Sequence, residues 1–293
     1  MAGSAGRRLR ASPRRAPGPR VKAHPWPVVA GLTVVLALGA CGSPGDGGPP
    51  ATQAVQAGPA DSRWLPAPTT SWQWQLSGDL DLEVDADVFD VDYERTTRAE
   101  ADTLKRDGRR LICYLSAGSW EDFRADAGAF PPAVLGDVLS GWPNEQWLDI
   151  RRLDVLLPIM AARMDTCVEK GFDAVEPDNV DGYLNATGFP LTAADQLAYN
   201  RAVAELAHFR GLSVALKNDV DQIPDLVDDF DFAINEECVR YAECDLYDPF
   251  TDAGKAVLHV EYQGSLGFCA ETERRGLSSM LKPLDLGAVR RPC

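Results

Sequence analysis

The sequence predicts an α/β fold, a (β/α)8 TIM barrel in a single domain, and three observations lead to this prediction. Beyond the first 70 residues, roughly 220 of the 293 residues remain, a typical length for such a barrel. Short apolar runs alternate with longer segments of helical pattern. Gly108, Gly171 and Gly211 each stand between a predicted helix and a strand, which favours parallel βα units. The alternative is an open doubly wound sheet, but no G-x-G-x-x-G follows the first strand.

Residues 1–40 have the pattern of a secretory signal peptide. They hold seven Arg or Lys and no acid, and an apolar run from Val28 to Leu38 follows the basic residues. That run is too short for a comfortable membrane span. Residues 38–41, LGAC, resemble a lipobox, so we expect a lipoprotein signal peptide and a lipid on Cys41. The alternative is ordinary cleavage nearby, with Cys41 incidental.

Residues 41–70 are expected to form a disordered, lipid-anchored linker. They are rich in Gly, Pro and Ala and contain few large apolar residues, so they cannot bury a core. The folded domain is expected to span residues 71–293. We therefore expect an exported protein, either a lipoprotein at the outer face of the cell membrane or a secreted protein.

The barrel strands are predicted from the short apolar runs and the helices from the segments between them. Eight strands are predicted, at residues 72–75, 87–91, 110–115, 172–176, 212–216, 230–235, 256–261 and 277–281. Helices are predicted at residues 97–107, 153–170 and 192–209, the last with Thr192 as its N-cap.

Polar side chains gather where the predicted strands end, and in a barrel this face carries the chemistry. The residues at these ends are Asp90, Asp92, Tyr114, Ser116, Glu176, Asp178, Asn179, Lys217, Asn218, Asp219, Glu236, Glu237, Glu261, Tyr262 and Lys282. One polar end is compatible with a solvated turn, whereas so many at one rim predict a functional cleft.

Glu176, Asp178 and Asp181 crowd together in the segment FDAVEPDNVDGY, where a predicted strand ends and a loop begins. Neighbouring negative charges disfavour one another's ionisation. Glycoside cleavage needs this difference, because one carboxyl must donate a proton while another stays ionised as nucleophile or base. A calcium site and a plain solvated loop are the alternatives, although the segment lacks the D-x-D-x-D-G spacing of an EF-hand.

Five motifs in order, ICYLSAGSWE, WLDIR, GFDAVEPDNVDGY, LKN and INEEC, together resemble glycoside hydrolase family 114, the endo-α-1,4-polygalactosaminidases and their barrel relatives. The resemblance covers roughly residues 72–282. It implies a (β/α)8 barrel and the endo-hydrolysis of an α-1,4-linked galactosaminoglycan, an amino-sugar polymer. It also implies a catalytic pair, an Asp after the fourth strand and a Glu after the sixth.

The resemblance places this catalytic pair at Asp178 and at Glu236. Each has a competitor, because Glu176 stands where many relatives have Asp, and Glu237 directly follows Glu236. We assign Asp178 as nucleophile and Glu236 as acid/base in a retaining scheme. The sequence itself leaves the two roles and the stereochemistry open.

The charge balance favours a cationic substrate. Without residues 1–40, Lys plus Arg falls from 29 to 22 while Asp plus Glu stays at 44, which leaves a net charge near −22. Such a chain is an improbable partner for nucleic acid and attracts a polymer of free amines, although solubility alone would also account for the charge.

The predicted substrate-binding residues follow from this charge and from the strand ends. Pairing with ammonium groups is expected of Asp90, Asp92, Asp181 and Glu261. Contact with sugar rings is expected of Tyr114, Trp120, Tyr183 and, unless they belong to the barrel core, Trp72 and Trp74. The set is completed by Ser116, Asn179, Asn218 and Tyr262, and by Lys217, which is expected to pair with a carboxylate and keep it ionised.

Six cysteines follow Cys41, and an even number in an exported chain indicates disulfides. Cys238 and Cys244 are close enough in sequence to clip a loop, but the sequence alone does not choose among the fifteen possible pairings. The candidate pairs are Cys238–Cys244, Cys269–Cys293 and Cys113–Cys167.

No cofactor and no metal site is expected. None of the cysteines has zinc-finger spacing, and only His208 and His259 follow the leader. His259 lies inside an apolar strand and is interpreted as a core residue. The protein is expected to be a monomer that binds an amino-sugar polysaccharide. The alternative functions are a non-catalytic carbohydrate-binding lipoprotein and a barrel hydrolase for a different glycan.

Overall fold

The computed structural model describes residues 63–293 of the chain. The predicted signal peptide, Cys41 and the linker as far as residue 62 lie outside the described residues, so the statements about them stay predictions. Within residues 63–293, no helix combines the length and the apolar character needed to cross a membrane.

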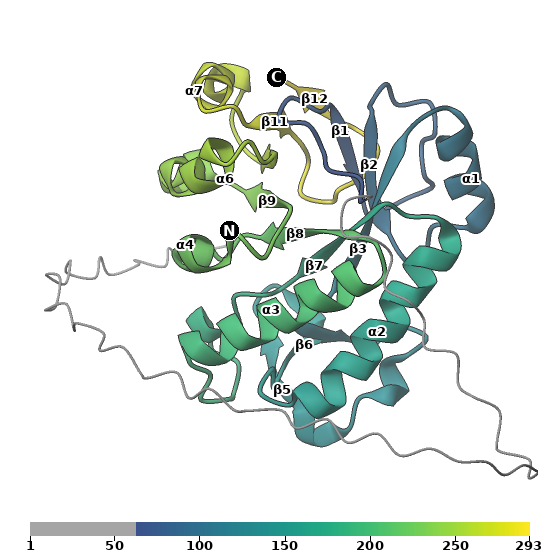
Figure 1. The fold of residues 1–293 in the computed structure, drawn as a ribbon, viewed down its shortest axis with the longest axis vertical. Coiled ribbons are helices and arrows are strands. Elements are labelled where there is room, and N and C mark those ends of the chain that lie inside the picture. The colour runs from purple at the N-terminus through teal and green to yellow at the C-terminus, as the bar shows by residue number, and fades with distance from the viewer. Residues whose placement is uncertain (1–62) are drawn as a thin grey trace, which may run out of the picture. The chain divides into compact units, whose positions relative to one another are not determined.

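One sheet of nine strands runs through the domain, in the order β1-β2-β3-β7-β8-β9-β10-β11-β12 (Figure 1). Neighbours pair in parallel from β1 to β11, and β12 is antiparallel to β11. The strands are β1 Trp72–Gln75, β2 Val88–Asp92, β3 Arg110–Ser116, β7 Ala174–Asp178, β8 Ser213–Lys217, β9 Phe232–Glu236, β10 Val257–Glu261, β11 Ser278–Leu281 and β12 Arg291–Pro292. The eight parallel strands lie within two residues of their predicted positions, so the prediction of a parallel α/β fold is confirmed.

The sheet curls until its first and last parallel strands are joined by side chains, which is consistent with a TIM-like barrel. Trp72 Nε1 donates a hydrogen bond to the Ser278 carbonyl at 3.0 Å, and Lys282 Nζ donates to Gln73 Oε1 at 3.2 Å. The structure departs from eight equal βα units between β1 and β2, where residues 76–87 form a loop without a helix.

Helices lie around the outside of the curled sheet (Figure 1). They are α1 Arg98–Arg106, α2 Leu153–Lys170, α3 Ala193–Phe209, α4 Ile223–Leu226, α5 Cys238–Tyr241, α6 Asp248–Asp252 and α7 Cys269–Arg274. The predicted N-cap is present, because Thr192 accepts from the Asp195 N–H while the Asp195 side chain accepts from the Thr192 N–H. Gly171 ends α2 in the left-handed conformation, with φ 86°, as its position predicts.

Residues 119–148 contain a small antiparallel sheet that the sequence did not predict. Its strands, in spatial order, are β4 Ser119–Glu121, β6 Trp142–Leu148 and β5 Leu135–Leu139. The insertion follows β3 and is tied to the domain by ion pairs. Arg124 pairs with Asp92 at the end of β2 at 2.7 Å, and Arg163 of α2 pairs with Asp126 at 2.7 Å. These contacts hold the small sheet at the rim of the large one.

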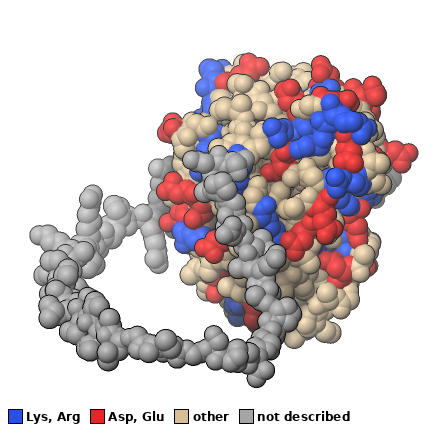
Figure 2. Space-filling model, turned by 45° about the vertical axis from the view of Figure 1, so that its right-hand side comes forward, with Lys and Arg blue, Asp and Glu red and all other residues tan. Residues whose placement is uncertain are grey.

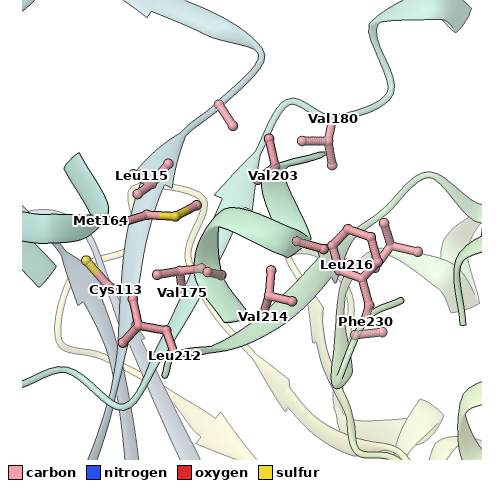
Figure 3. Packing of buried hydrophobic residues seen from close by; sticks show 14 of the residues in the cluster. Cys113, Leu115, Met164, Val175, Val180, Val203, Leu212, Val214, Leu216 and Phe230 are labelled. Atoms are coloured by element: carbon pink, nitrogen blue, oxygen red, sulfur yellow. The ribbon is translucent and has the colours of Figure 1, made fainter. Parts of the chain in front are cut away.

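Two hydrophobic clusters lie on the two faces of the large sheet. Between sheet and helices, Val175 of β7 packs in one cluster with Met164 of α2 and Val203 of α3 (Figure 3). Inside the curl, Ile112 of β3 and Ala174 of β7 belong to a second cluster. Because successive strand residues face opposite sides, every second residue after Ile112 and Ala174 also faces the interior.

The six cysteines of the domain form three disulfides in the structure. Cys113–Cys167 joins β3 to α2, Cys238–Cys244 closes a short loop after β9, and Cys269–Cys293 ties the C-terminus to α7. These are the candidate pairs considered from the sequence.

The turn between β3 and β4 runs directly against the end of β7. The backbone N–H groups of Ala117 and Gly118 both donate to the Asp178 carbonyl, at 2.9 and 3.0 Å. A Cβ atom on residue 118 would lie 1.7 Å from the Asn179 carbonyl oxygen, so only glycine fits there. Gly118 therefore fixes the main chain at residues 178 and 179.

We expect Gly118→Ala to destabilise the protein by roughly 1–3 kcal/mol, because the added methyl group must displace backbone atoms. Gly128→Ala is the matched control, since a Cβ at that position meets nothing within 4 Å. Chemical denaturation of both variants measures the difference. Equal stability of the two variants would show that the turn does not touch β7 as described.

Candidate active site

The carboxyl ends of three neighbouring strands place charged side chains inside the curled sheet. In β7, Glu176 and Asp178 lie on the interior face with Ala174. In β9, Glu236 follows the interior residue Ile234 by two positions. Strand β8 lies between β7 and β9 and ends at Lys217. Adjacent strands are about 4.8 Å apart, so one side chain from the middle strand can reach both neighbours.

Lys217 lies at the centre of this group. Its Nζ is 2.9 Å from Glu176 Oε1, 3.1 Å from Asp178 Oδ1 and 3.4 Å from Glu236 Oε2. Burial alone would lower the pKa of Lys217, but the charges of the three carboxylates hold it well above its usual range. The Nζ also lies 4.5 Å from the centre of the Trp74 ring, on the interior side of β1. Lys217 is therefore a buried cation shared by three acids.

Asp178 is surrounded by hydrogen-bond donors. Besides Lys217, the Tyr114 hydroxyl donates to its Oδ2 at 2.9 Å and the Asn179 backbone N–H donates to its Oδ1 at 2.8 Å. Burial raises the pKa of Tyr114 well above its usual range, and the Asp178 charge raises it further, so the phenol remains a donor. The side chain of Asp178 is 19% exposed, which leaves it open to a ligand.

Glu236 has a matching set of donors on the other side of Lys217. Asn218 Nδ2 donates to its Oε2 at 3.1 Å, and the Tyr262 hydroxyl donates to its Oε1. Its side chain is 29% exposed. Since Lys217 Nζ contacts both Asp178 and Glu236, the two carboxylates cannot be farther apart than the sum of those two contacts. They can therefore flank a single bond of a bound molecule.

Asp90 and Glu176 form a second pair, fully buried beneath this rim. Burial raises the pKa of Asp90 well above its usual range, and the negative charge of Glu176 raises it further. Burial also raises the pKa of Glu176, against the opposing charge of Lys217. Within residues 63–293 neither oxygen of Asp90 has a hydrogen-bond partner of good geometry. Burial and mutual repulsion therefore disfavour two negative charges on this pair.

Comparison with known proteins identifies the family. Residues 52–293 match the sequence profile of glycoside-hydrolase family GH114. This chain belongs to that family. It is accordingly a glycosidase, and the two accessible carboxylates beside Lys217 occupy the mouth of a GH114 domain.

Two solved structures and one sequence relative are similar to the GH114 chain. The crystal structure of Ega3 from Aspergillus fumigatus, in complex with galactosamine, is 37% identical, with a TM-score of 0.74 over 78% of this chain and 97% of that one. The glycoside hydrolase domain of PelA from Pseudomonas aeruginosa is 15% identical, with a TM-score of 0.61 over 75% of this chain and 97% of that one, and shows the same fold. An uncharacterized protein of Deinococcus radiodurans is 27% identical over 304 residues, which cover 86% of this chain and 94% of that one.

Three predicted acidic site residues of the GH114 domain are engaged elsewhere. Asp92 pairs with Arg124 at 2.7 Å, and Glu237 pairs with Arg240. Glu261 accepts from the Val239 N–H at 2.9 Å and contacts His259 Nε2 at 3.0 Å. We therefore no longer expect Asp92 or Glu261 to bind an ammonium group, nor Glu237 to replace Glu236.

Burial removes several other predicted residues from contact with a substrate. Asp90, Ser116 and Glu176 are fully buried, so Glu176 is not accessible as an alternate catalytic residue. Trp72 and Trp74 are buried in the interior cluster, as the alternative interpretation of these two residues held. His259 is a buried core residue whose two ring nitrogens contact Ser279 and Glu261, as expected.

Asp181 and Tyr183 lie on the loop after β7, close to further acids. Burial raises the pKa of Asp181 to about 6, and the charge of Asp178 contributes to that shift. Burial raises the pKa of Tyr183, and the negative charge of Asp219 raises it further. Burial raises the pKa of Asp219 itself to about 8. Asp219 stands at a predicted strand end, but sequence reasoning did not include it among the site residues.

Unusual backbone conformations mark the same rim. Non-glycine residues with positive φ directly follow β7, β8 and β9, at Asn179 with 61°, Asn218 with 49°, Asp219 with 46° and Glu237 with 63°. Such conformations are costly and collect at functional sites, where the surrounding contacts hold them. Here they turn the chain sharply after each strand, so that the backbone N–H of Asn179 reaches Asp178 and the side chain of Asn218 reaches Glu236.

One group in residues 63–293 has the spacing of metal ligands, formed by Cys238, Cys244 and His259. The two cysteines are joined in a disulfide and therefore offer no thiolate. All three side chains are buried, and as a group they lack the thiolates of a zinc site.

We expect Lys217→Met to destabilise the protein by about 3–5 kcal/mol, because it leaves the facing carboxylates without a counter-charge. Adding Glu176→Gln to Lys217→Met removes one of those charges and should restore part of the lost stability. Denaturation of the two single variants and the double variant, as a double-mutant cycle, measures this effect. Lys282→Met is the matched control, because this buried lysine contacts neutral oxygens of residues 73, 287 and 289. If Glu176→Gln restores stability equally in the Lys282→Met variant, or restores none in the Lys217→Met variant, Lys217 is not a cation shared by these acids.

Proposed function

We propose that this chain hydrolyses an α-1,4-linked galactosaminoglycan-type polymer at internal linkages, with Asp178 as nucleophile and Glu236 as acid/base in a retaining mechanism. The observation that carries the proposal is Lys217 Nζ, which contacts both carboxylates at 3.1 and 3.4 Å. Two accessible carboxylates held on one cation at the rim of a GH114 domain are placed to act on one glycosidic bond.

The roles follow from the donors and the exposure of each carboxylate. In the first step an Asp178 oxygen bonds to the anomeric carbon while the glycosidic oxygen leaves with a proton from Glu236. In the second step Glu236 takes a proton from water, whose oxygen displaces Asp178 from the sugar. The backbone N–H of Asn179 and the Tyr114 hydroxyl stabilise the negative charge on Asp178. Glu236 has the more exposed side chain, which suits a group that exchanges protons with water.

The spacing of the two carboxylates supports retention. Their nearest oxygens can be no farther apart than the sum of the two Lys217 contacts. That ceiling favours the separation of about 5–5.5 Å found in retaining enzymes over the roughly 6.5–9.5 Å of inverting ones.

The substrate class rests on charge and on similarity. Ega3, which is 37% identical to this chain, was crystallised with galactosamine. The whole chain carries a net charge of −15, and Asp181 and Asp219 add acids beside the catalytic pair. A polymer with free amines is cationic and is drawn to such a site. We also propose, from residues 38–41 alone, that the enzyme is exported and anchored by a lipid on Cys41.

Mixed charge on the surface agrees with a polysaccharide partner. Figure 2 shows one face of the molecule, where acidic and basic side chains are interspersed rather than gathered into one basic patch. Binding of a nucleic-acid backbone relies on clustered Lys and Arg. Among the residues that the structure describes, the face in Figure 2 shows no such cluster, and we propose a glycan as the partner.

We expect Asp178→Asn and Glu236→Gln each to lower kcat by about 10²–10⁴-fold or more, because each removes a group that forms or breaks a bond. Glu237→Gln is the matched control, since this neighbouring acid pairs with Arg240. Release of reducing ends from the polymer measures all three variants. Full activity in both catalytic variants would contradict the assignment of these two residues. Glycan binding without any hydrolysis, in the wild type as well as in the variants, would favour the non-catalytic carbohydrate-binding function instead.

We expect cleavage of de-N-acetylated α-1,4-galactosaminoglycan but not of chitosan or neutral α-glucans. KM for the cationic polymer should rise with salt, because ions screen attraction over about 8–10 Å. Product sizes on a gel distinguish endo from exo cleavage. Equal activity on a neutral α-glucan would support the barrel hydrolase of a different glycan.

A further inference from the structure

A continuous chain of hydrogen bonds links the inserted small sheet to the end of β7. Ser119 Oγ donates to Glu145 Oε2 at 2.9 Å, and the hydroxyls of Ser116 and Ser119 lie 2.6 Å apart. Asn179 Nδ2 donates to Ser116 Oγ at 2.9 Å and approaches Ser119 Oγ at 3.2 Å. The Asn179 backbone N–H donates to Asp178 Oδ1 at 2.8 Å. Glu145 of β6 is thus connected to Asp178 through three residues.

The directions of the hydrogen bonds between the side chains of this chain depend on Glu145. An ionised carboxylate only accepts, so the single hydroxyl hydrogen of Ser119 goes to Glu145. The hydrogen between the two serines must then come from Ser116, whose oxygen also accepts from the Ser119 N–H at 3.1 Å. Ser116 can therefore only accept from Asn179, which turns the NH₂ of the Asn179 side chain toward the serines.

This orientation matters because Asn179 is held in a costly conformation. Its φ is 61°, and its backbone N–H reaches Asp178 only while the residue keeps that turn. Both serines are fully buried, so water does not replace a lost partner without cost. The insertion that carries Glu145 is in turn fixed to the domain by Arg124 and Arg163.

We propose that Glu145 is a positioning residue for the reaction, which acts through Ser119, Ser116 and Asn179 to hold the Asp178 carboxylate in place. The proposal rests on the proposed function, in which Asp178 is the nucleophile. Glu145 itself does not touch the reacting atoms, so its effect falls on kcat more than on KM.

The ionisation of Glu145 gives this arrangement a pH dependence. Burial raises the pKa of Glu145 to about 7, against the hydrogen bond from Ser119. Above that pH the carboxylate accepts a charge-assisted hydrogen bond, and below it a weaker neutral one. Activity is therefore full above about pH 7 and falls as the pH drops through it. The other titratable or charged groups that face Glu145 are Glu121, Arg124, Tyr114 and Asp178.

The test compares Glu145→Gln and Glu145→Ala with the wild type, using de-N-acetylated α-1,4-galactosaminoglycan from pH 5 to 9. The glutamine oxygen still accepts from Ser119 but does not titrate. We expect its kcat to be about threefold to tenfold lower above pH 7 and the step near pH 7 to disappear. Glu145→Ala should lose about tenfold to a hundredfold in kcat with little change in KM. Val138→Ala, an exposed position on β5 of the same small sheet, is the control and should match the wild type.

Each outcome decides the proposal. If the pH profile of Glu145→Gln keeps the wild-type step near pH 7, the proposal is wrong, even where Glu145→Ala fails to fold. An unchanged kcat in Glu145→Ala would also overturn the proposal. If Glu145→Gln has a lower melting temperature but the kcat and pH profile of the wild type, Glu145 has only a structural role and the proposal is wrong. If Asp178→Asn remains active, the proposed function itself is wrong. If Asp178→Asn is inactive while Glu145→Ala keeps its full activity, only the role of Glu145 is wrong.

Discussion

The structure depends on one buried ammonium group that three acids share. Lys217 projects from the middle of three adjacent strands, and the carboxylates of Glu176, Asp178 and Glu236 lie within 3.4 Å of its Nζ. Without it these acids would repel one another in a site that excludes much of the solvent, a cost of several kcal/mol. Strand order β7-β8-β9 makes the arrangement possible, because the cation comes from the strand between the two that carry the acids.

The strand period explains how much of this the sequence could predict. Once the ends of the parallel strands are predicted, Asp178 and Glu236 are expected at the same rim of the sheet. The sequence therefore predicted that these two residues lie close together. The same period also excludes one predicted site residue. Glu261 shares its face of β10 with His259, outside the interior cluster. Glu237 lies just beyond the end of β9, where the backbone turns with φ 63°, so the period does not apply to it.

Long-range contacts explain what the sequence could not predict. Asp92 follows Asp90 on the interior face of β2, but it forms an ion pair with Arg124 of the insertion and is therefore not available to a substrate. Nothing in the local pattern of residues 119–148 indicates that Glu145 would meet Ser119 and, through it, the end of β7. The burial of Asp90 and Glu176 depends on how far each strand continues beyond them. The sequence pattern predicts the end of a strand only to within a few residues. The insertion thus explains the wrong prediction for Asp92 and supplies the further positioning residue.

The most direct test of the proposed active site is chemical rescue of Asp178→Ala with azide, using de-N-acetylated α-1,4-galactosaminoglycan oligomers. Azide is small enough to occupy the space of the missing carboxylate beside Lys217 and attack the anomeric carbon from the same side. We expect the variant to be inactive alone, and azide to restore cleavage with a β-configured glycosyl azide as product, identified by mass spectrometry and NMR. Undiminished hydrolysis without azide, or an α-configured azide, would contradict the placement of the nucleophile at Asp178.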